Sequence, residues 1–156
     1  MQTKTNAIRL LERSKLPFEL FHYEVDESDL SAGALAAKNG LDIDRIFKTL
    51  VLRTVTGELF VCVIPGSCEL NLKKAAAAMK SKKVEMIAVK ELLPLTGYIR
   101  GGCSPLGMKK AYPTLIDETC HLFPTIYVSA GVRGTQILLS PEDLIDQSRA
   151  EAVDLV

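Results

Sequence analysis

The sequence predicts a mixed α+β fold, in which a mixed, largely antiparallel sheet curls into a partial barrel with helices on its flanks. Strand-like segments pair as hairpins, amphipathic segments lie between the hairpins, and strands and helices do not alternate strictly as in a doubly wound parallel sheet. The 156 residues, 47% of them hydrophobic, suffice for a buried core. We expect a single domain over residues 1–156.

The first forty residues predict two helices and a strand. Apolar and charged residues occupy opposite sides of a predicted helix over residues 5–14, which Pro17 ends. Residues 18–25 alternate as in a strand. Ser31 can cap a short helix that runs to residue 39, and Gly40 is a suitable left-handed terminator.

The strongest hairpin signal lies in residues 46–64. Two nearly continuous runs of apolar and β-branched residues, 46–54 and 58–64, are separated by a Thr-Gly turn, so this hairpin is expected at the centre of the sheet. Asn71 then caps an alanine-rich helix whose lysines face outward. A strand over residues 83–89 and a short helix that Pro94 ends complete this part.

The last third of the chain predicts a second hairpin and a final helix. A strand over residues 113–117 precedes a helical turn near Glu118. Residues 125–131 and 135–140 form a hairpin across a Gly-Val-Arg-Gly turn. Pro141 and the acids that follow it suit the first turn of a helix through about residue 149.

Composition excludes several classes of protein. High hydrophobicity with zero net charge argues against disorder, and neither a bilayer-spanning stretch nor a signal-peptide core is found, so we expect a cytoplasmic protein. Zero net charge alone argues against a nucleic-acid partner. However, residues 71–110 carry nine basic and two acidic residues, a balance of +7. This span predicts a surface that attracts phosphate, or only solvated lysines on helices.

The cysteines and histidines do not predict a metal or a cofactor. The four cysteines form no Cys-x-x-Cys pair, and with the two histidines they lack zinc-ligand spacing. We expect reduced thiols that pack as small hydrophobic groups. The cysteines and histidines are Cys62, Cys68, Cys103, Cys120, His22 and His121.

Two segments could carry chemistry. The glycine-rich loop over residues 101–110 can direct backbone N–H groups at one ligand oxygen, although such a loop can also be a simple turn. It is not a nucleotide triphosphate loop, because Met108 stands where lysine is required. Lys48, in an apolar strand, either lies at an exposed edge or faces a pocket as an anion-binding cation. Cys103 is a conceivable nucleophile that lacks a visible histidine partner.

Four segments taken together resemble the YbaK/ProX family of tRNA-editing domains. They are FKTLV around Lys48, KKVEM, TGYIRGGCSPLGMKK and IYVSAGVRG, in the family's order and over nearly the whole chain. KKVEM and SPLG-x-KK resemble the YbaK branch of freestanding deacylases, which clear cysteine mischarged onto proline tRNA. The resemblance implies a partial-barrel fold, a mischarged tRNA(Pro) substrate, no cofactor, and prolyl-tRNA synthetase as a partner to be tested.

The resemblance also assigns roles to residues. Lys48 matches the essential lysine, and Tyr23 and the Ser129–Gly131 turn match pocket positions. Gln136 stands where relatives commonly carry an acid, and residues 31–33 lack a Phe-Gly pair of close relatives. The residues that match the loop holding the terminal adenosine and the ester are Gly101, Gly102, Ser104, Pro105 and Gly107. The candidate tRNA contacts are Lys73, Lys74, Lys82, Lys83, Lys109 and Lys110.

The mechanism implied by the resemblance needs little catalytic machinery. The substrate's own cysteine thiol would attack its ester carbonyl and release a thiolactone and free tRNA, with Cys103 packing the loop. Cys-tRNA(Cys) is a further substrate to test. Two alternatives remain open at this point. They are an Ala-tRNA(Pro) deacylase of the same family and a non-catalytic RNA- or nucleotide-binding module. The sequence does not define the oligomeric state.

Overall fold

The computed structural model describes residues 4–156. Its helices are α1 (Asn6–Ser14), α2 (Ala32–Asn39), α3 (Leu72–Ala78), α4 (Val89–Thr96) and α5 (Pro141–Ser148), with 3-10 turns η1 (Ile43–Arg45) and η2 (Glu118–Leu122). Its strands are β1 (Glu19–His22), β2 (Phe47–Thr54), β3 (Leu59–Pro65), β4 (Val84–Met86), β5 (Thr114–Asp117), β6 (Ile126–Ser129), β7 (Thr135–Leu139) and β8 (Glu151–Val153).

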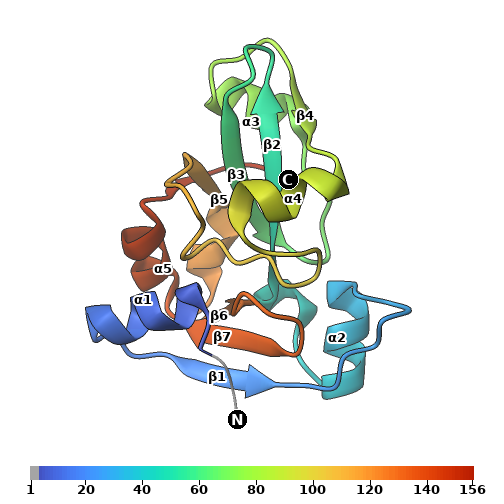
Figure 1. Ribbon diagram of the computed structural model, residues 1–156, viewed down its shortest axis with the longest axis vertical. Helices are drawn as coiled ribbons and strands as arrows, with labels where there is room; N and C mark the ends of the chain where they lie inside the picture. Colours follow the sequence, from blue (N-terminus) through green and yellow to red (C-terminus); the bar gives the residue numbers. More distant parts are fainter. Residues whose placement is uncertain (1–3) are drawn as a thin grey trace.

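The strands form two sheets. One is antiparallel in the order β1-β7-β6, and the other is mixed in the order β4-β2-β3-β5-β8. Ile46 and Tyr127 form a bridge between them at the start of β2. In Figure 1 the small sheet lies across the base of the molecule and the β2–β3 hairpin rises from it. The α+β class is confirmed, and neither sheet closes into a barrel within residues 4–156.

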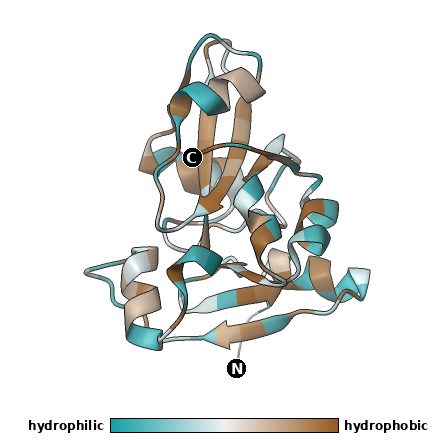
Figure 2. Cartoon of the chain, turned by 180° about the vertical axis from the view of Figure 1, so that it is seen from behind, coloured by the Kyte–Doolittle hydropathy of each residue, from teal (hydrophilic) through white to brown (hydrophobic). Residues whose placement is uncertain are grey.

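The β2–β3 hairpin supplies core residues to both faces of the larger sheet. Figure 2 shows the hydrophobic residues concentrated along these strands. Val51 and Val63 pack with α1, α5 and the small sheet, whereas Leu52, Phe60 and Ile64 pack with α3. Alternation of side chains along a strand explains the division. The prediction of a central hairpin is confirmed, because β2 and β3 both have a strand on either side.

The predicted caps are confirmed. Ser31 accepts a hydrogen bond from Ala34 N–H, and Gly40 ends α2 at φ +65°. Asn71 accepts from Lys73 N–H and Lys74 N–H at the start of α3. Side-chain capping satisfies N–H groups that have no partner inside the helix.

Three element predictions differ from the structure. Helix α4 starts at Val89 and runs through Pro94, so the predictions that residue 89 continues a strand and that Pro94 ends the helix were wrong. Proline removes one helical hydrogen bond, but the helix ends only at Gly97, whose φ is +87° and whose N–H bonds to Leu93 O. The strand predicted over residues 18–25 is limited to residues 19–22, which pair with β7.

Strand β8 was not predicted. It has three residues and pairs in parallel with β5. The buried Asp117 carboxylate fixes the segment that follows β8, because it accepts a hydrogen bond from Leu155 N–H at 2.8 Å. Within the described part of the chain, no helix has the length and apolar character needed to cross a bilayer.

Candidate active site

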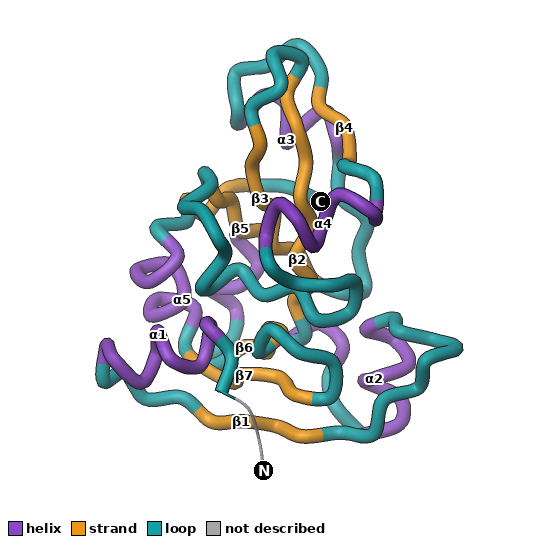
Figure 3. The backbone as a smooth tube through the Cα atoms, in the orientation of Figure 1, coloured by secondary structure: helices purple, strands orange, loops and turns teal. Residues whose placement is uncertain are grey.

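A cavity of about 510 Å³ lies where several distant segments meet. Its walls come from the loop between β1 and α2 apart from Glu27, from α2, the start of β2, the β4–α4 junction, Arg100 with the glycine loop, and the β6–β7 hairpin. Figure 3 shows the long loops that lead from β1 to α2 and from α4 to β5, and residues of both loops line the cavity. The predicted site residues that line the cavity are Tyr23, Lys48, Gly101, Ser129 and Gln136.

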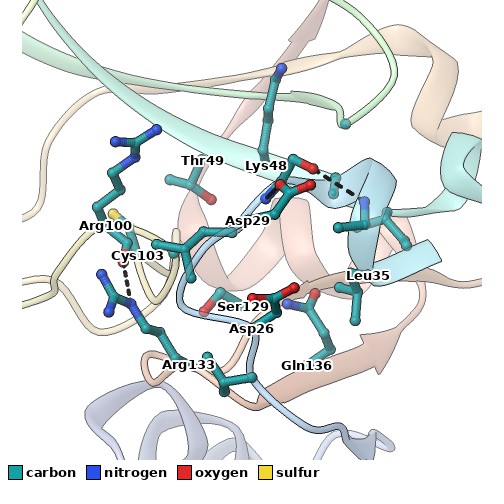
Figure 4. A pocket seen from close by; sticks show the side chains of 18 of the residues that line it. Asp26, Asp29, Leu35, Lys48, Thr49, Arg100, Cys103, Ser129, Arg133 and Gln136 are labelled. Carbon is teal, nitrogen blue, oxygen red and sulfur yellow. Dashed lines mark hydrogen bonds between the residues drawn. The ribbon is translucent and has the colours of Figure 1, made fainter. Parts of the chain in front are cut away.

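Lys48 lies at the cavity and at a sheet edge. β4 pairs only with residues 52–54 of β2, so the first part of β2 has no β4 neighbour. The half-buried Lys48 side chain forms no hydrogen bond or ion pair with residues 4–156. Lys48 and Thr49 leave the strand on opposite faces, and Figure 4 shows the lysine side chain extending away from Ser129 and Gln136. Lys48 thus combines the two predicted positions, a sheet edge and a cavity wall, and its anion-binding role stays a prediction.

Two buried polar atoms at the cavity lack partners. Gln136 is 6% exposed, and neither its Oε1 nor the Oγ1 of Thr49 has a hydrogen-bond partner within the described residues. An unsatisfied buried polar group costs about 1–3 kcal/mol. Ser129 differs, because its Oγ accepts a hydrogen bond from Gly131 N–H. The cavity thus presents two acceptors that a bound donor would satisfy.

Much of the rest of the glycine loop is buried behind the cavity wall and is held there by hydrogen bonds. Ser104 is fully buried and accepts a hydrogen bond from Leu106 N–H, and Tyr98 Oη donates to Leu106 O at 2.7 Å. A Cβ at Gly107 would lie 2.7 Å from the backbone of Asn6. Four of the predicted residues therefore lie behind the cavity wall and do not line the cavity. The four are Gly102, Ser104, Pro105 and Gly107. Gly131 does not line it either, and it lies close to the Tyr98 ring.

Acidic residues in one wall of the cavity were missed by sequence reasoning. Asp26 and Asp29 lie in the loop between β1 and α2, and the Asp26 carboxylate accepts from Lys38 Nζ at 2.6 Å and from Ser28. The hydrogen bond from Lys38 is the main reason that the pKa of Asp26 is well below its usual range. Asp29 accepts a hydrogen bond from Ser31 N–H. The sequence showed acids here but gave no sign that they line the same cavity as Lys48.

Cys103 lines the cavity but is not a reactive thiol. It is 8% exposed, and burial raises its pKa to about 12. At neutral pH the group is therefore a neutral thiol, whereas the thiolate is the nucleophile. Within residues 4–156, no histidine lines the cavity. These observations agree with the packing role and give no support to an enzyme nucleophile.

The candidate tRNA contacts lie outside the cavity. Five of the six lysines are exposed, and Lys74 is half-buried. Lys74 Nζ forms an ion pair with Asp154 at 2.8 Å and donates to Val156 O. Lys109 lies against Gly97, and its Nζ is 3.4 Å from Pro94 O at the end of α4. Lys74 thus binds the C-terminal segment. Lys109 lies beside α4, whose first residues line the cavity.

The fold and the site define a mixed α+β protein with an open cavity that combines a cation, unsatisfied acceptors and a glycine turn. No group of three or more metal-ligating side chains occurs in residues 4–156. Residues 27–147 match the family model described as the aminoacyl-tRNA editing domain. The chain belongs to this family, as its sequence motifs predicted.

Individual relatives agree with this placement. The chain is 46% identical to a protein of Enterococcus faecalis with the provisional name Cys-tRNA(Pro)/Cys-tRNA(Cys) deacylase EbsC, over 99% of this chain and 94% of that protein. It is 32% identical to proline–tRNA ligase of Pelobacter propionicus, over 56% of this chain and 15% of the ligase. A solved structure provisionally described as a trans-editing enzyme for prolyl-tRNA synthetase has a TM-score of 0.83 at 22% identity, covering 96% and 94% of the two chains. The last comparison supports the fold.

Proposed function

We propose that this protein is a freestanding deacylase that removes cysteine mischarged onto tRNA(Pro), with Cys-tRNA(Cys) as a second substrate. Family membership and the relative from Enterococcus faecalis support the reaction class. The observation that carries the proposal is a cavity lined by two unsatisfied acceptors and a neutral thiol, with the unpaired Lys48 also in its lining. Such a cavity suits a substrate that brings its own nucleophile.

The two unsatisfied acceptors suit the α-ammonium group of an aminoacyl ester. Gln136 Oε1 and Thr49 Oγ1 would each accept one of its N–H bonds. Lys48 supplies a mobile positive charge that can approach the ester from the open edge of β2. The glycine loop at Gly101 then provides backbone donors for the carbonyl oxygen. Lys48 is proposed as the catalytic residue, and Tyr23 and Ser129 as cavity walls.

The reaction is an intramolecular acyl transfer. The substrate sulfur forms a bond to the ester carbonyl carbon, the bond to the ribose oxygen breaks, and the thiol proton passes to that oxygen. The products are a cysteine thiolactone and tRNA with a free 3′ end. Correct orientation can lower the barrier by about 7–11 kcal/mol, and one oxyanion donor by about 3 kcal/mol more. Serine and alanine substrates lack the thiol and should react poorly.

The cellular setting is part of the proposal. We infer that residues 1–156 act as one cytoplasmic editing domain, which meets its tRNA with help from prolyl-tRNA synthetase. The similarity to part of a proline–tRNA ligase supports this association. A pull-down with purified synthetase, with and without tRNA(Pro), measures it directly.

The proposal is tested by comparing Cys-, Ala- and Ser-charged tRNA(Pro). We expect release of cysteine alone at a high rate, and loss of that activity in Lys48→Ala. Arg9→Ala, which removes an exposed cation of α1 outside the cavity, is the matched control. Near-normal turnover by Lys48→Ala would overturn the role of Lys48. Faster release of alanine would assign the protein to the alanine branch, and tRNA binding without release would make it a binding module.

A further inference from the structure

Arg133 connects three walls of the cavity. It lies in the turn between β6 and β7, and its side chain is 25% exposed. Its Nε–H donates to the carbonyl oxygen of Arg100 at 2.8 Å, a bond drawn in Figure 4. Its Nη1 pairs with the Glu27 carboxylate at 3.0 Å. One side chain thus joins the β6–β7 turn, the start of the glycine loop at Arg100, and the loop between β1 and α2.

The bond to Arg100 acts on a particular kind of turn. Gly102 N–H donates to Ile99 O at 2.9 Å, which closes a β-turn over residues 99–102. Its third residue, Gly101, has φ +81°, whereas Arg100 does not have a positive φ. These angles define a type II turn. Type I and type II turns differ in the orientation of the central peptide, here Arg100–Gly101, and glycine makes the type II orientation accessible.

Fixing the Arg100 carbonyl also fixes the Gly101 N–H. In a trans peptide these two groups point in opposite directions, so the N–H is directed away from the carbonyl that Arg133 holds. The Gly101 N–H makes no hydrogen bond within residues 4–156, and Gly101 lines the cavity. A Cβ on Gly101 would lie 3.3 Å from Arg133 Nε and 3.4 Å from Leu30 Cδ1. The turn is therefore closely packed on the side of Arg133.

We propose that Arg133 is a positioning residue that holds the Arg100–Gly101 peptide so that the Gly101 N–H donates to the ester carbonyl oxygen of the substrate. This inference rests on the proposed deacylase function. The guanidinium group also polarises the peptide that it binds, which strengthens the N–H as a donor where negative charge develops. Glu27 balances the charge of Arg133 and is not itself a wall residue.

The kinetic test uses Arg133→Gln and Arg133→Lys with Glu27→Gln as the matched control. Both Arg133 variants lose the guanidinium fork, whereas Glu27→Gln leaves the Nε–H bond to Arg100 in place. We expect kcat on Cys-tRNA(Pro) to fall about 100-fold in the Arg133 variants with KM little changed. Glu27→Gln should retain most of kcat. A wild-type kcat in Arg133→Gln, or a loss confined to KM, overturns the inference.

A second measurement does not depend on turnover. In amide NMR spectra without substrate, Arg133→Gln should shift the Gly101 signal while signals from α3 stay in place. An unchanged Gly101 amide overturns the positioning role, even if the wild-type protein proves inactive. Absence of wild-type deacylation, by contrast, contradicts the proposed function itself. The two failures are therefore distinguishable, and a shifted Gly101 signal together with lower kcat supports the inference.

Discussion

Gln136 carries a buried polar atom whose missing partner opposes folding. Its amide oxygen is buried without a partner, so the folded protein bears a desolvation cost that a ligand can remove. The sequence identified the position only through the family motif. The missing partner depends on which loops surround β7, and these contacts span long separations in the chain.

Replacement of Gln136 by methionine should separate stability from function. Gln136→Met removes the unsatisfied oxygen at similar volume, so we expect unfolding to cost about 1 kcal/mol more and the Tm to rise by roughly 2–4 °C. KM should rise about 10-fold, because a hydrogen bond to a charged group is lost. Calorimetry and deacylation kinetics measure the two effects. Gln136→Glu should behave oppositely, with lower Tm and tighter binding, and equal behaviour of both variants would exclude contact with the ammonium group.

Cys103 provides a test of where the nucleophile resides. Because burial raises its pKa to about 12, its thiolate is scarce throughout the ordinary working range of pH. We expect Cys103→Ala to retain deacylation and to give the same pH–rate profile as wild type between about pH 6 and 9, since the substrate thiol titrates near 8.5. If the deacylation rate rises with pH in the wild type but not in Cys103→Ala, the titrating thiol is that of Cys103, and Cys103 is the nucleophile.

At the scale of elements, local signals predicted helix starts and hairpins well. Ser31 and Asn71 cap as expected, because capping depends on residues only two or three positions away. The prediction failed at Pro94 and at β8, where partners distant in the chain decide the outcome. β8 exists because it can pair with β5, and nothing in its three residues indicates that pairing.

Helix α4 is held by an ion pair whose effect depends on pH. Arg53 contacts both carboxylate oxygens of Glu91, which also accepts a hydrogen bond from Ala88 N–H. These bonds, chiefly that from Arg53, lower the pKa of Glu91. A lowered folded pKa contributes stability that is complete above the unfolded value of about 4.3 and is lost as pH falls through the folded value.

We therefore expect Glu91→Gln to lower the Tm at pH 7 and to approach wild type near pH 3. Scanning calorimetry at both pH values measures this convergence. Glu58→Gln, at an exposed carboxylate that precedes β3, controls for loss of negative charge. A Tm difference that is the same at pH 3 and pH 7 would show that packing of α4, and not ionisation of Glu91, accounts for it.

For the whole molecule, the central question is how a chain with no net charge holds tRNA. The basic span predicted from sequence does not form one surface around the cavity. Helix α3 packs on the sheet face that carries Leu52 and Phe60, whereas residues next to α4 pack on the opposite face. The number of lysines is evident from the sequence, but their division into two groups follows only from the three-dimensional arrangement.

The lysines after the glycine loop should contact tRNA more than those of α3. Each lost phosphate contact on a single strand lowers the slope of log affinity against log salt by about 0.7. We expect Lys109→Glu with Lys110→Glu to raise KM and to reduce this slope by about 1.4, leaving turnover of a cysteinyl-adenosine ester unchanged. Lys74→Glu should lower the Tm, because it places like charges beside Asp154, and should leave the slope intact. If Lys74→Glu reduces the salt slope and the Lys109→Glu, Lys110→Glu variant does not, the tRNA contacts α3 instead.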